Sequence, residues 1–527
     1  MDHHDEAVAG IAATVRQLYD RKEAFRIYHG STHGTRQSSL LQTEIVDISH
    51  LSHVLKVDRE RNTALVEPSV PMDYLLRATL EHGLIPPVVM EFPGITVGES
   101  FAGAAGESSS FKHGLFDRTI NWIEIVLANG DVVNASDTKD PELFSGAASS
   151  FGTLGIATLL ELRLVEARTY VELVYFPVTS VSHAVEKIKE ASYDLSNDYI
   201  DGILFARNHG VIMTGRLTDL HKDGPRIQQF SQPRDPWFYL HAKASSTGST
   251  ATTTEVIPLE DYLFRYDRGA FWTGAHAFKY FMAPFNRVTR WAFDSFMHAQ
   301  FLFRAGHESG HGSRYIVQEF AVPAPTAQKF VEYVDETLGS YPLWLCPLRP
   351  KGQLPLHQRN PYSIPGGPME KILINVRVWG PGPSTHDLLV KVNRKLEQRV
   401  RQLSGTKWLS ALTYYTEAEF WDIYDRDWYD GLRAKYYATN LPTVHDIVRV
   451  DLRAQRKAIS GIWAIWPLGG VWGVLRAALG SDFFRTPDPL SLRDFTPFFA
   501  LVSIIFIFIA IVWMQRKEGL EMKIQHT

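Results

Sequence analysis

The stretch Gly103-Ala104-Ala105-Gly106-Glu107-Ser108-Ser109-Ser110 decides how this sequence folds. Its glycines let backbone N–H groups approach a bound pyrophosphate closely, and its serine hydroxyls add hydrogen-bond donors. One such loop carries little information, because glycine turns are common. Three more glycine-rich segments accompany it, at residues 29–35, 93–98 and 152–156. Together the four segments predict a binding site for a cofactor that carries phosphate.

The residues that we expect to contact this cofactor lie in or beside these four segments. They are Gly30, Ser31, Thr32, His33, Gly34, Gly94, Thr96, Val97, Gly98, Gly103, Gly106, Glu107, Ser108, Ser109, Ser110, His113, Gly114, Gly152, Thr153, Leu154, Gly155 and Ile156. No G-x-G-x-x-G follows a predicted strand, and no G-x-x-x-x-G-K-[ST] occurs. A Rossmann or P-loop site is therefore disfavoured.

Short strands and helices surround the glycine-rich segments. We expect strands at 45–48, 63–67, 123–128 and 156–165, a helix at 72–82, and a hairpin turn at Asn129-Gly130 leading into Val132-Val133. A new unit begins near Thr169, and the sequence from 170 to 450 is rich in aromatic residues. Such a stretch either lines a large apolar pocket or packs an ordinary core. The mixture predicts an α+β fold.

Length and composition limit the kind of protein. The sequence has 527 residues, of which 45% are hydrophobic and 21% charged. It is long enough for two domains, each with its own hydrophobic core, and a further segment. A net charge of -4 gives no general affinity for nucleic acid. The single cysteine, Cys346, excludes an internal disulfide and a cysteine-based metal site, and favours a reducing compartment such as the cytosol.

Two apolar segments stand near the C-terminus. Residues 495–515 are long enough for a transmembrane helix, and Trp513, Arg516 and Lys517 are typical interfacial anchors. Residues 458–475 are shorter and are interrupted by Pro467 and two glycines, which favours an interfacial or re-entrant segment over a second span. The acidic N-terminus lacks the pattern of a signal peptide.

One motif matches a zinc-binding pattern without being expected to bind zinc. His307-Glu308-Ser309-Gly310-His311 matches H-E-x-x-H, whose zinc chemistry needs both histidines on one helix face. Glycines at 306, 310 and 312 each cost a helix about 1 kcal/mol relative to alanine. We expect a flexible loop here and no metal site.

The ordered segments resemble the FAD-binding domain of the vanillyl-alcohol-oxidase and PCMH superfamily. The matching pieces are Thr96-Val97-Gly98, residues 106–116 and Gly152-Thr153-Leu154-Gly155. Glu99 stands where that superfamily usually has a second glycine. The resemblance implies a two-subdomain FAD-binding domain followed by an α+β substrate domain.

Within the superfamily, residues from about 26 to 448 resemble the Δ24-sterol reductases. The motifs that carry this likeness are Glu67-Pro68, Glu107-Ser108-Ser109-Ser110, residues 211–215, 257–259 and 271–272, residues 341–347 and residues 419–422. Two features depart from the family: the loop at 29–36, and the apolar helix, which stands last in this sequence where the family's is N-terminal.

The resemblance implies non-covalent FAD, NADPH as reductant, and reduction of a carbon–carbon double bond in the side chain of an apolar sterol. Lys112, Tyr414 and Tyr415 are candidates for the group that protonates the alkene, although each also has an ordinary structural explanation. His29 and His33 are not expected to bond FAD covalently. Two alternatives stay open: a flavin oxidase or double-bond isomerase, and a membrane-tethered sterol-binding protein without activity.

The implied domain order has five parts. They are a PCMH-type FAD-binding domain at 1–168, a substrate domain at 169–450 that returns to the flavin domain, an apolar segment at 451–494, a transmembrane helix at 495–515 and a tail at 516–527. We expect the protein in the endoplasmic reticulum membrane with its catalytic domain facing the cytosol. The sequence does not indicate an oligomeric state.

Overall fold

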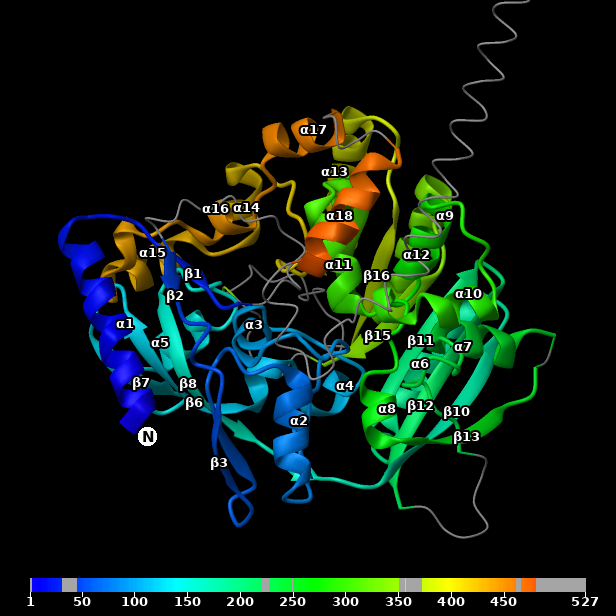
Figure 1. The fold of residues 1–527 in the computed structure, drawn as a ribbon, viewed down its shortest axis with the longest axis horizontal. Coiled ribbons are helices and arrows are strands. Elements are labelled where there is room, and N and C mark those ends of the chain that lie inside the picture. Colours follow the sequence, from blue (N-terminus) through cyan, green and yellow to red (C-terminus); the bar gives the residue numbers. More distant parts are fainter. Residues whose placement is uncertain are drawn as a thin grey trace, which may run out of the picture.

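Two large antiparallel sheets and two small two-stranded sheets, with helices between and around them, form the described part of the protein (Figure 1). The structure is a computed structural model that describes residues 2–30, 45–219, 227–248, 250–349, 356, 372–460 and 466–479. The architecture is α+β, as the sequence predicts.

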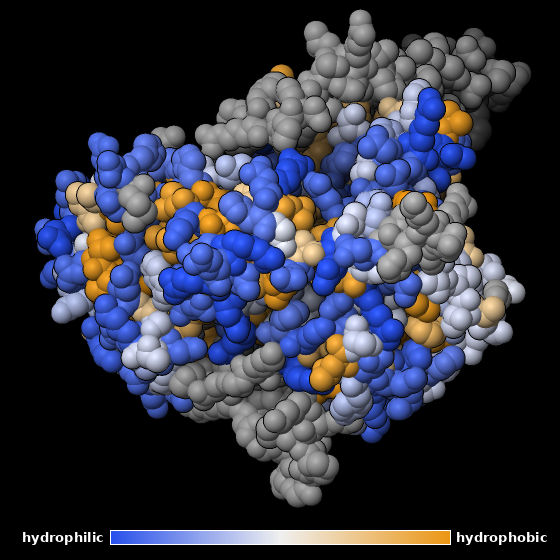
Figure 2. Space-filling model, turned by 90° about the horizontal axis from the view of Figure 1, so that it is seen from below, coloured by the Kyte–Doolittle hydropathy of each residue, from blue (hydrophilic) through white to orange (hydrophobic). Residues whose placement is uncertain are grey.

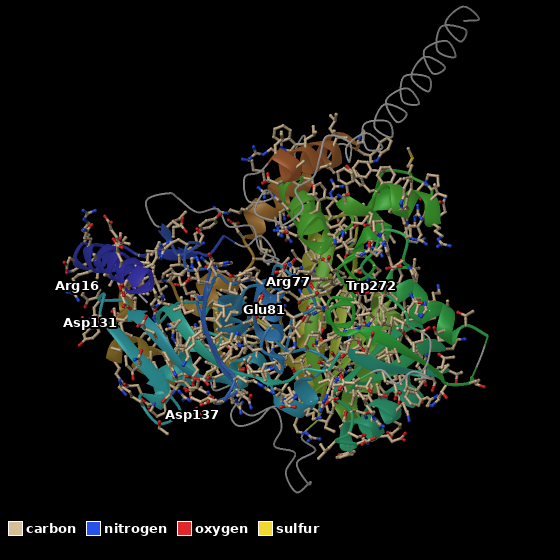
Figure 3. All side chains as sticks on the ribbon, turned by 60° about the horizontal axis from the view of Figure 1, so that its bottom comes forward. Arg16, Arg77, Glu81, Asp131, Asp137 and Trp272 are labelled. Atoms are coloured by element: carbon tan, nitrogen blue, oxygen red, sulfur yellow. The ribbon has the colours of Figure 1, made fainter. Side chains whose placement is uncertain are left out.

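The first sheet has five strands in the order β3-β4-β8-β6-β7. Its strands are β3 (Val54–Asp58), β4 (Thr63–Val66), β6 (Ile120–Leu127), β7 (Val132–Ser136) and β8 (Gly155–Arg163). The predicted hairpin is confirmed, since Gly130 takes a left-handed φ of 85° between β6 and β7. Helix α1 (Asp2–Asp20) packs along this sheet, and Arg16 of α1 donates to Asp131 at 2.8 Å (Figure 3).

Short elements fill the space beside the first sheet. They are β1 (Arg26–Tyr28), β2 (Ile45–Asp47), α2 (Met72–Leu80), β5 (Leu84–Ile85), α3 (Val97–Ala102), α4 (Ser110–His113), the 3-10 helix η2 (Phe116–Thr119), α5 (Pro141–Ala147) and β9 (Val165–Glu166). The predictions of β2, β4, β8 and α2 are confirmed to within a few residues.

The second sheet has eight strands in the order β13-β10-β12-β11-β15-β16-β14-β17. Their bounds are β10 (Tyr170–Val178), β11 (Tyr199–Ala206), β12 (His209–Thr218), β13 (Thr253–Pro258), β14 (Tyr315–Pro323), β15 (Leu343–Leu348), β16 (Leu373–Pro381) and β17 (Thr406–Lys407). One face is covered by α6 (Val181–Tyr193), α12 (Ala324–Leu338) and α13 (His386–Gln402). The other face packs an aromatic core against residues 2–168, which we call the first half or FAD-binding half of the protein; the residues after 168 form the second half.

The remaining helices close the aromatic core or return to the first sheet. They are α7 (Phe238–Ser246), α8 (Leu259–Leu263), α9 (Thr273–Tyr280), α10 (Arg287–Ala292), η3 (Asp294–Phe296), α11 (Ala299–Glu308), η4 (His311–Arg314), α14 (Glu417–Ile423), α15 (Arg426–Lys435), η6 (Ala438–Asn440), α16 (Val444–Val448), α17 (Leu452–Ser460) and α18 (Leu468–Leu479). Lys435 of α15 donates to Glu142 of α5 at 3.0 Å, so the second half of the protein returns to the first.

The predicted transmembrane helix at 495–515 lies outside the described residues. Within them, no helix has the length and apolar character needed to cross a bilayer.

Part of the second apolar segment forms α18, which packs against α11. A Cβ at Gly473 would stand only 2.4 Å from the Ala305 carbonyl oxygen. Hydrophilic residues dominate the face of the described residues that is seen from below (Figure 2).

Candidate cofactor and substrate site

The segment at 93–98 enters α3 in a conformation that requires glycine. The Gly98 N–H donates to the Pro68 carbonyl at 2.7 Å, and a Cβ at position 98 would stand 2.8 Å from Pro68 Cβ. Thr96 and Glu99 form a capping box, in which each backbone N–H donates to the other side chain. Glu99, the departure from the superfamily pattern, thus caps α3 and also lies 3.6 Å from His29 Nε2.

The loop before β8 holds an unusual run of left-handed backbone. Ser149, Phe151 and Gly152 have φ values of 67°, 51° and 79°. A Cβ at Gly152 would stand 2.3 Å from Ile27 Cδ1 of β1. Ser149 Oγ is buried and has no hydrogen-bond partner among the described residues. Strained backbone beside a buried, unsatisfied hydroxyl is typical of a ligand-binding loop.

Thr153 ties this loop to the C-terminal return. Its hydroxyl lies 2.7 Å from the Tyr429 hydroxyl of α15, which also accepts from the Val444 N–H at 3.0 Å. The glycine-rich loop is therefore braced from the other half of the protein.

The turn at 103–110 places a buried carboxyl between the two sheets. The Glu107 N–H donates to Ser110 Oγ at 2.9 Å, and the Ser108 N–H donates to the Glu107 carboxylate. Burial raises the pKa of Glu107 to about 7; the cation of Arg265 lowers it, and the carboxylates of Glu91 and Asp201 raise it further. Glu107 Oε1 has no hydrogen-bond partner among the described residues.

Arg377 of β16 lies beside this carboxyl and bridges the two halves of the protein. Its Nη1 is 2.6 Å from Glu91 Oε1 and its Nε is 2.8 Å from Glu319 Oε1. The guanidinium stacks 4.6 Å from the rings of three aromatic residues, Phe271, Trp344 and Trp379. The motif at 271–272 and the motif at 341–347 therefore meet at one buried cation. Trp272 lies in the interior of this region (Figure 3).

Lys112, a candidate proton donor, is engaged elsewhere. Its Nζ donates to Asp198 Oδ1 at 2.7 Å and to the Asn197 carbonyl at 3.4 Å, so it joins α4 to the loop before β11. His113 ends α4, and Gly114 follows with a φ of 87°. The ion pair assigns Lys112 a structural contact between the two halves.

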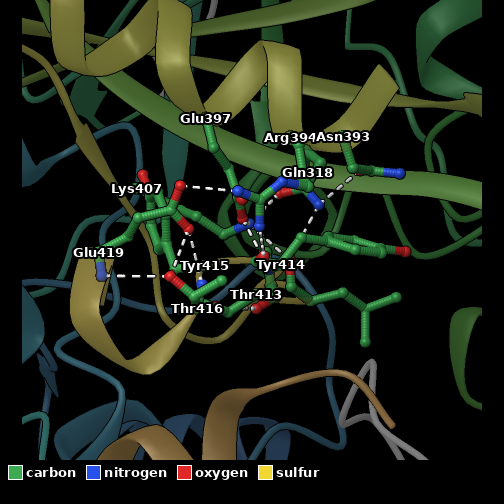
Figure 4. Close-up of polar contacts among 12 residues, drawn as sticks. Gln318, Asn393, Arg394, Glu397, Lys407, Thr413, Tyr414, Tyr415, Thr416 and Glu419 are labelled. Atoms are coloured by element: carbon green, nitrogen blue, oxygen red, sulfur yellow. Dashed lines mark hydrogen bonds and ion pairs between the residues drawn. The ribbon is translucent and has the colours of Figure 1, made fainter. Parts of the chain in front are cut away.

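Tyr414 and Tyr415 lie beside a buried polar network (Figure 4). At its centre, Lys407 Nζ donates to Glu397 Oε1 at 2.7 Å, and Glu397 Oε1 accepts from the Tyr414 N–H at 2.9 Å. The Tyr414 hydroxyl accepts from Gln455 Nε2 at 2.9 Å, and burial raises its pKa to about 12. The Tyr415 ring packs with Phe420 and other apolar residues. The two tandem side chains therefore have different surroundings.

A cavity of about 760 Å³ lies between α9, α11, β14, α17 and α18. Its walls are mainly apolar, with Phe278, Phe281, Phe293, Phe296, Phe301, Phe303, Trp379, Leu302, Val317 and Val474. At one side it reaches Arg26 of β1, next to the glycine-rich loop of Gly152. The large apolar pocket that the aromatic content suggested is therefore present.

A smaller polar group also lines the cavity. Tyr280, His276, His311 and Tyr315 contact one another through their rings, with centroid distances of 4.7 to 5.6 Å. Burial lowers the pKa of His311 to about 4 and raises the pKa of Tyr315 to about 12. Of these four, the sequence had drawn attention only to His311, as part of the H-E-x-x-H segment, because nothing but the aromatic enrichment pointed to the others.

The H-E-x-x-H segment does not present two histidines on one helix. His307 and Glu308 belong to the last turn of α11, Gly310 has a φ of 66°, and His311 starts η4. The expectation of a loop is thus wrong for the first two residues. The left-handed Gly310 separates the histidines that a zincin site would keep together.

Four predicted cofactor residues, Ser31, Thr32, His33 and Gly34, lie outside the described residues. Gly30 follows β1 with a φ of 76°. The other predicted positions divide among the α3 entrance, the turn at 103–110, α4 with the Gly114 that follows it, and the loop before β8 with the first residues of that strand. The ring of Phe101 in α3 contacts the ring of Phe144 in α5, with 6.3 Å between the ring centroids. The α3 entrance and the loop before β8, which follows α5, are therefore neighbours.

Comparison with known proteins agrees with this geometry. Residues 6–136 match the family described as an FAD binding domain. The human Delta(24)-sterol reductase is 29% identical over 409 residues, covering 75% of this protein and 76% of the human protein. The Delta(24)-sterol reductase of Arabidopsis thaliana is 28% identical over 423 residues, covering 75% and 74%. The Caenorhabditis elegans Delta(24)-sterol reductase homolog dhcr-24 is 27% identical over 428 residues, covering 75% and 77%.

The protein therefore carries an FAD-binding domain of the PCMH type. It is a homologue of the Δ24-sterol reductases of animals and plants. The strand β8, which completes the first sheet, follows the matched residues 6–136 in the sequence.

Proposed function

We propose that this protein is a Δ24-sterol reductase-like flavoenzyme that reduces a carbon–carbon double bond in the side chain of a desmosterol- or lanosterol-type sterol. FAD is held without a covalent bond, and NADPH is the reductant. The single observation that carries the proposal is the cavity, which has mainly apolar walls, is large enough for a small hydrophobic molecule and is adjacent to the FAD-binding half.

The residues present fit FAD. Backbone at Gly98 and Gly152 comes too close to its neighbours for a side chain, and Ser149 Oγ and Glu107 Oε1 are buried polar atoms in need of a partner. We propose that the α3 entrance and the loop before β8 hold the pyrophosphate.

Bound FAD supplies a two-electron carrier that NADPH reduces and that delivers hydride to carbon. An isolated alkene accepts hydride poorly, so the second carbon needs a well-placed acid. Tyr315 replaces Lys112, Tyr414 and Tyr415 as our candidate, because it alone of the four lines the cavity and burial keeps its hydroxyl protonated, with a pKa of about 12. The apolar walls orient the alkene and exclude water.

We further propose that the protein is held at the endoplasmic reticulum membrane by residues 495–515, with the catalytic part facing the cytosol. The apolar composition of that segment supports the anchor, and the lone cysteine supports a reducing environment.

The test is anaerobic spectroscopy on the purified full-length protein. We expect a flavin absorbance band that NADPH bleaches and that desmosterol restores. A flavin band that NADPH does not bleach, but that the substrate bleaches and O2 then restores, would favour an oxidase. A substrate rearranged with no net redox change would favour an isomerase. Absence of flavin would refute the proposal.

A further inference from the structure

An unusual group of exposed apolar side chains lies at the outer side of the cavity. Seven of the 15 exposed large hydrophobic residues in the described part of the protein fall in two short segments, 282–291 and 468–479. The most exposed in the first segment are Val288, at 69%, and Met282, at 56%. Single exposed hydrophobic residues are ordinary, whereas a cluster marks an interaction surface.

Helix α10 shows the pattern most clearly. No residue of this helix is buried, and Val288 and Trp291, spaced i and i+3, stand on one side of it with exposures of 69% and 51%. The rings of Phe285 and Phe293, which flank α10, contact Phe278 of α9. The helix is therefore fixed to the protein by its ends while its apolar side faces outward.

Helix α18 continues the same surface. Trp466 Nε1 donates to the Tyr280 carbonyl at 2.6 Å, and the Gly470 N–H donates to the Tyr280 hydroxyl at 3.1 Å, so α18 begins against the end of α9. Leu468, Trp472 and Leu479 of α18 are exposed. We call the surface formed by 282–291 and α18 the apolar face; Figure 1 shows α18 in the upper middle of the protein and α10 at its right side.

The charge around the apolar face is positive. Residues 269–293 contain no Asp or Glu, while Lys279 and Arg287 are exposed and Arg290 is partly exposed. On α18, Arg476 lies 3.5 Å from Glu308, the acidic neighbour on α11. Exposed Trp and aliphatic side chains beside Lys and Arg are typical of helices that lie in the headgroup region of an anionic bilayer.

We infer that the apolar face docks onto a phospholipid bilayer. The sequence itself supports this occupant, because α18 ends at Leu479 and the apolar stretch 495–515 follows after a short connection. The docked face would also bring the cavity to the membrane, since Phe281, Gly470 and Val474 line that cavity. That a sterol enters there rests on the proposed function; the docking does not.

The test places a reporter on the apolar face of the full-length protein in vesicles. Cys346 is fully buried, so a cysteine introduced by Val288→Cys can be labelled with an environment-sensitive fluorophore. Leu195→Cys is the matched control, since Leu195 is 63% exposed and belongs to the loop after α6. Vesicles contain phosphatidylcholine with or without phosphatidylserine, and wild type treated with the same label gives the background.

We expect the label at 288 to shift to the blue in vesicles, to be quenched severalfold by doxyl-labelled lipid and to respond more strongly with phosphatidylserine, while the label at 195 does none of these. Equal behaviour of the two labels would overturn the inference, even if the flavin assay succeeds. A blue shift that needs no lipid and grows with protein concentration would also overturn it, because a second copy would then cover the face.

Discussion

Arg377 of the eight-stranded sheet and Glu91 of the FAD-binding half form a buried ion pair with 2.6 Å between Nη1 and Oε1. Both side chains are almost fully buried, so neither charge has water to replace its partner. Glu319 and three aromatic rings complete the surroundings of the cation. The contact between the two halves is therefore charged at its centre.

Removing this cation is expected to destabilise the protein strongly. Arg377→Met would leave Glu91 and Glu319 buried without compensation, at a cost of about 3–5 kcal/mol. The unfolding temperature, followed by circular dichroism, should fall by roughly 3–5 °C, because a protein of this length has a large entropy of unfolding. Arg77→Met is the matched control, because Arg77 pairs with Glu260 across the same two halves but at the surface. Its effect should stay within about 1 kcal/mol; equal losses would contradict the prediction.

Glu107 is expected to make stability depend on pH. Burial raises its pKa to about 7 from an ordinary 4.5, so between these values the folded protein retains a proton that the unfolded protein has released. Stability should therefore fall as the pH rises from about 4.5 to 7. Glu107→Gln should raise the unfolding temperature at about pH 8 and leave it nearly unchanged at about pH 4.5. Glu142→Gln, at an exposed carboxyl of α5, should show no such difference.

The role of the loop before β8 in binding FAD can be tested with two glycine-to-alanine variants. Both strain a left-handed backbone, but only one places the new Cβ against a neighbouring side chain. Gly152 and Gly83 have similar φ values of 79° and 69°, but a Cβ at 152 would meet Ile27 Cδ1 at 2.3 Å, whereas nothing lies within 4 Å at 83. Both alanine variants should lose about 1 kcal/mol of stability from strain. Only Gly152→Ala should also purify with less flavin, measured as the ratio of visible to ultraviolet absorbance. Equal flavin content in the two variants would remove this loop from the proposed FAD site.

A bulky substitution on the side of α9 that lines the cavity is expected to block sterol binding. Thr273, His276, Ala277 and Tyr280 line it, and Ala275 of the same helix does not. Ala277→Trp should slow sterol-dependent flavin reoxidation at least about tenfold while bleaching by NADPH is retained. Ala275→Trp should leave both steps close to wild type. If the two variants behaved alike, the sterol would have to bind elsewhere.

The proton donor can be identified with two conservative changes. Tyr315→Phe removes a hydroxyl that lines the cavity, and reoxidation by sterol should become roughly a hundredfold slower with flavin reduction unchanged. Lys112→Met should instead lower the unfolding temperature and keep reoxidation, because Lys112 is paired with Asp198. The opposite pattern would restore Lys112 as the acid.

Local patterns in the sequence predicted the elements that are formed by interactions between residues close in sequence. The hairpin of β6 and β7 follows from Asn129-Gly130, and α2 follows from apolar spacing before Gly83. Strand β3 was missed because it is an edge strand with partly exposed residues, including Lys56 and Asp58, and shows no clear alternation. The assignment of the glycine and serine residues of the turn at 103–110 to the cofactor stays a prediction.

The direction of side chains could not be read in the same way. Lys112 follows the cofactor turn in sequence, yet its partner Asp198 is 86 residues away, and no local pattern predicts that pair. The cavity draws on elements from β1 to α18, so its polar group is assembled only by the tertiary fold. Glu99 shows the converse, because a residue that breaks a family pattern has an ordinary role as a helix cap.

The packing of α18 on α11 also sets an order of assembly. Gly473 lets α18 approach the Ala305 carbonyl, and Val474 supplies part of the cavity wall. A ribosome makes this wall more than 150 residues after α11, so the nascent polypeptide can form both sheets before the cavity is enclosed. An apolar interior stays open during that interval, and a polypeptide released before α18 would expose it to the proteases and chaperones that remove unfinished proteins.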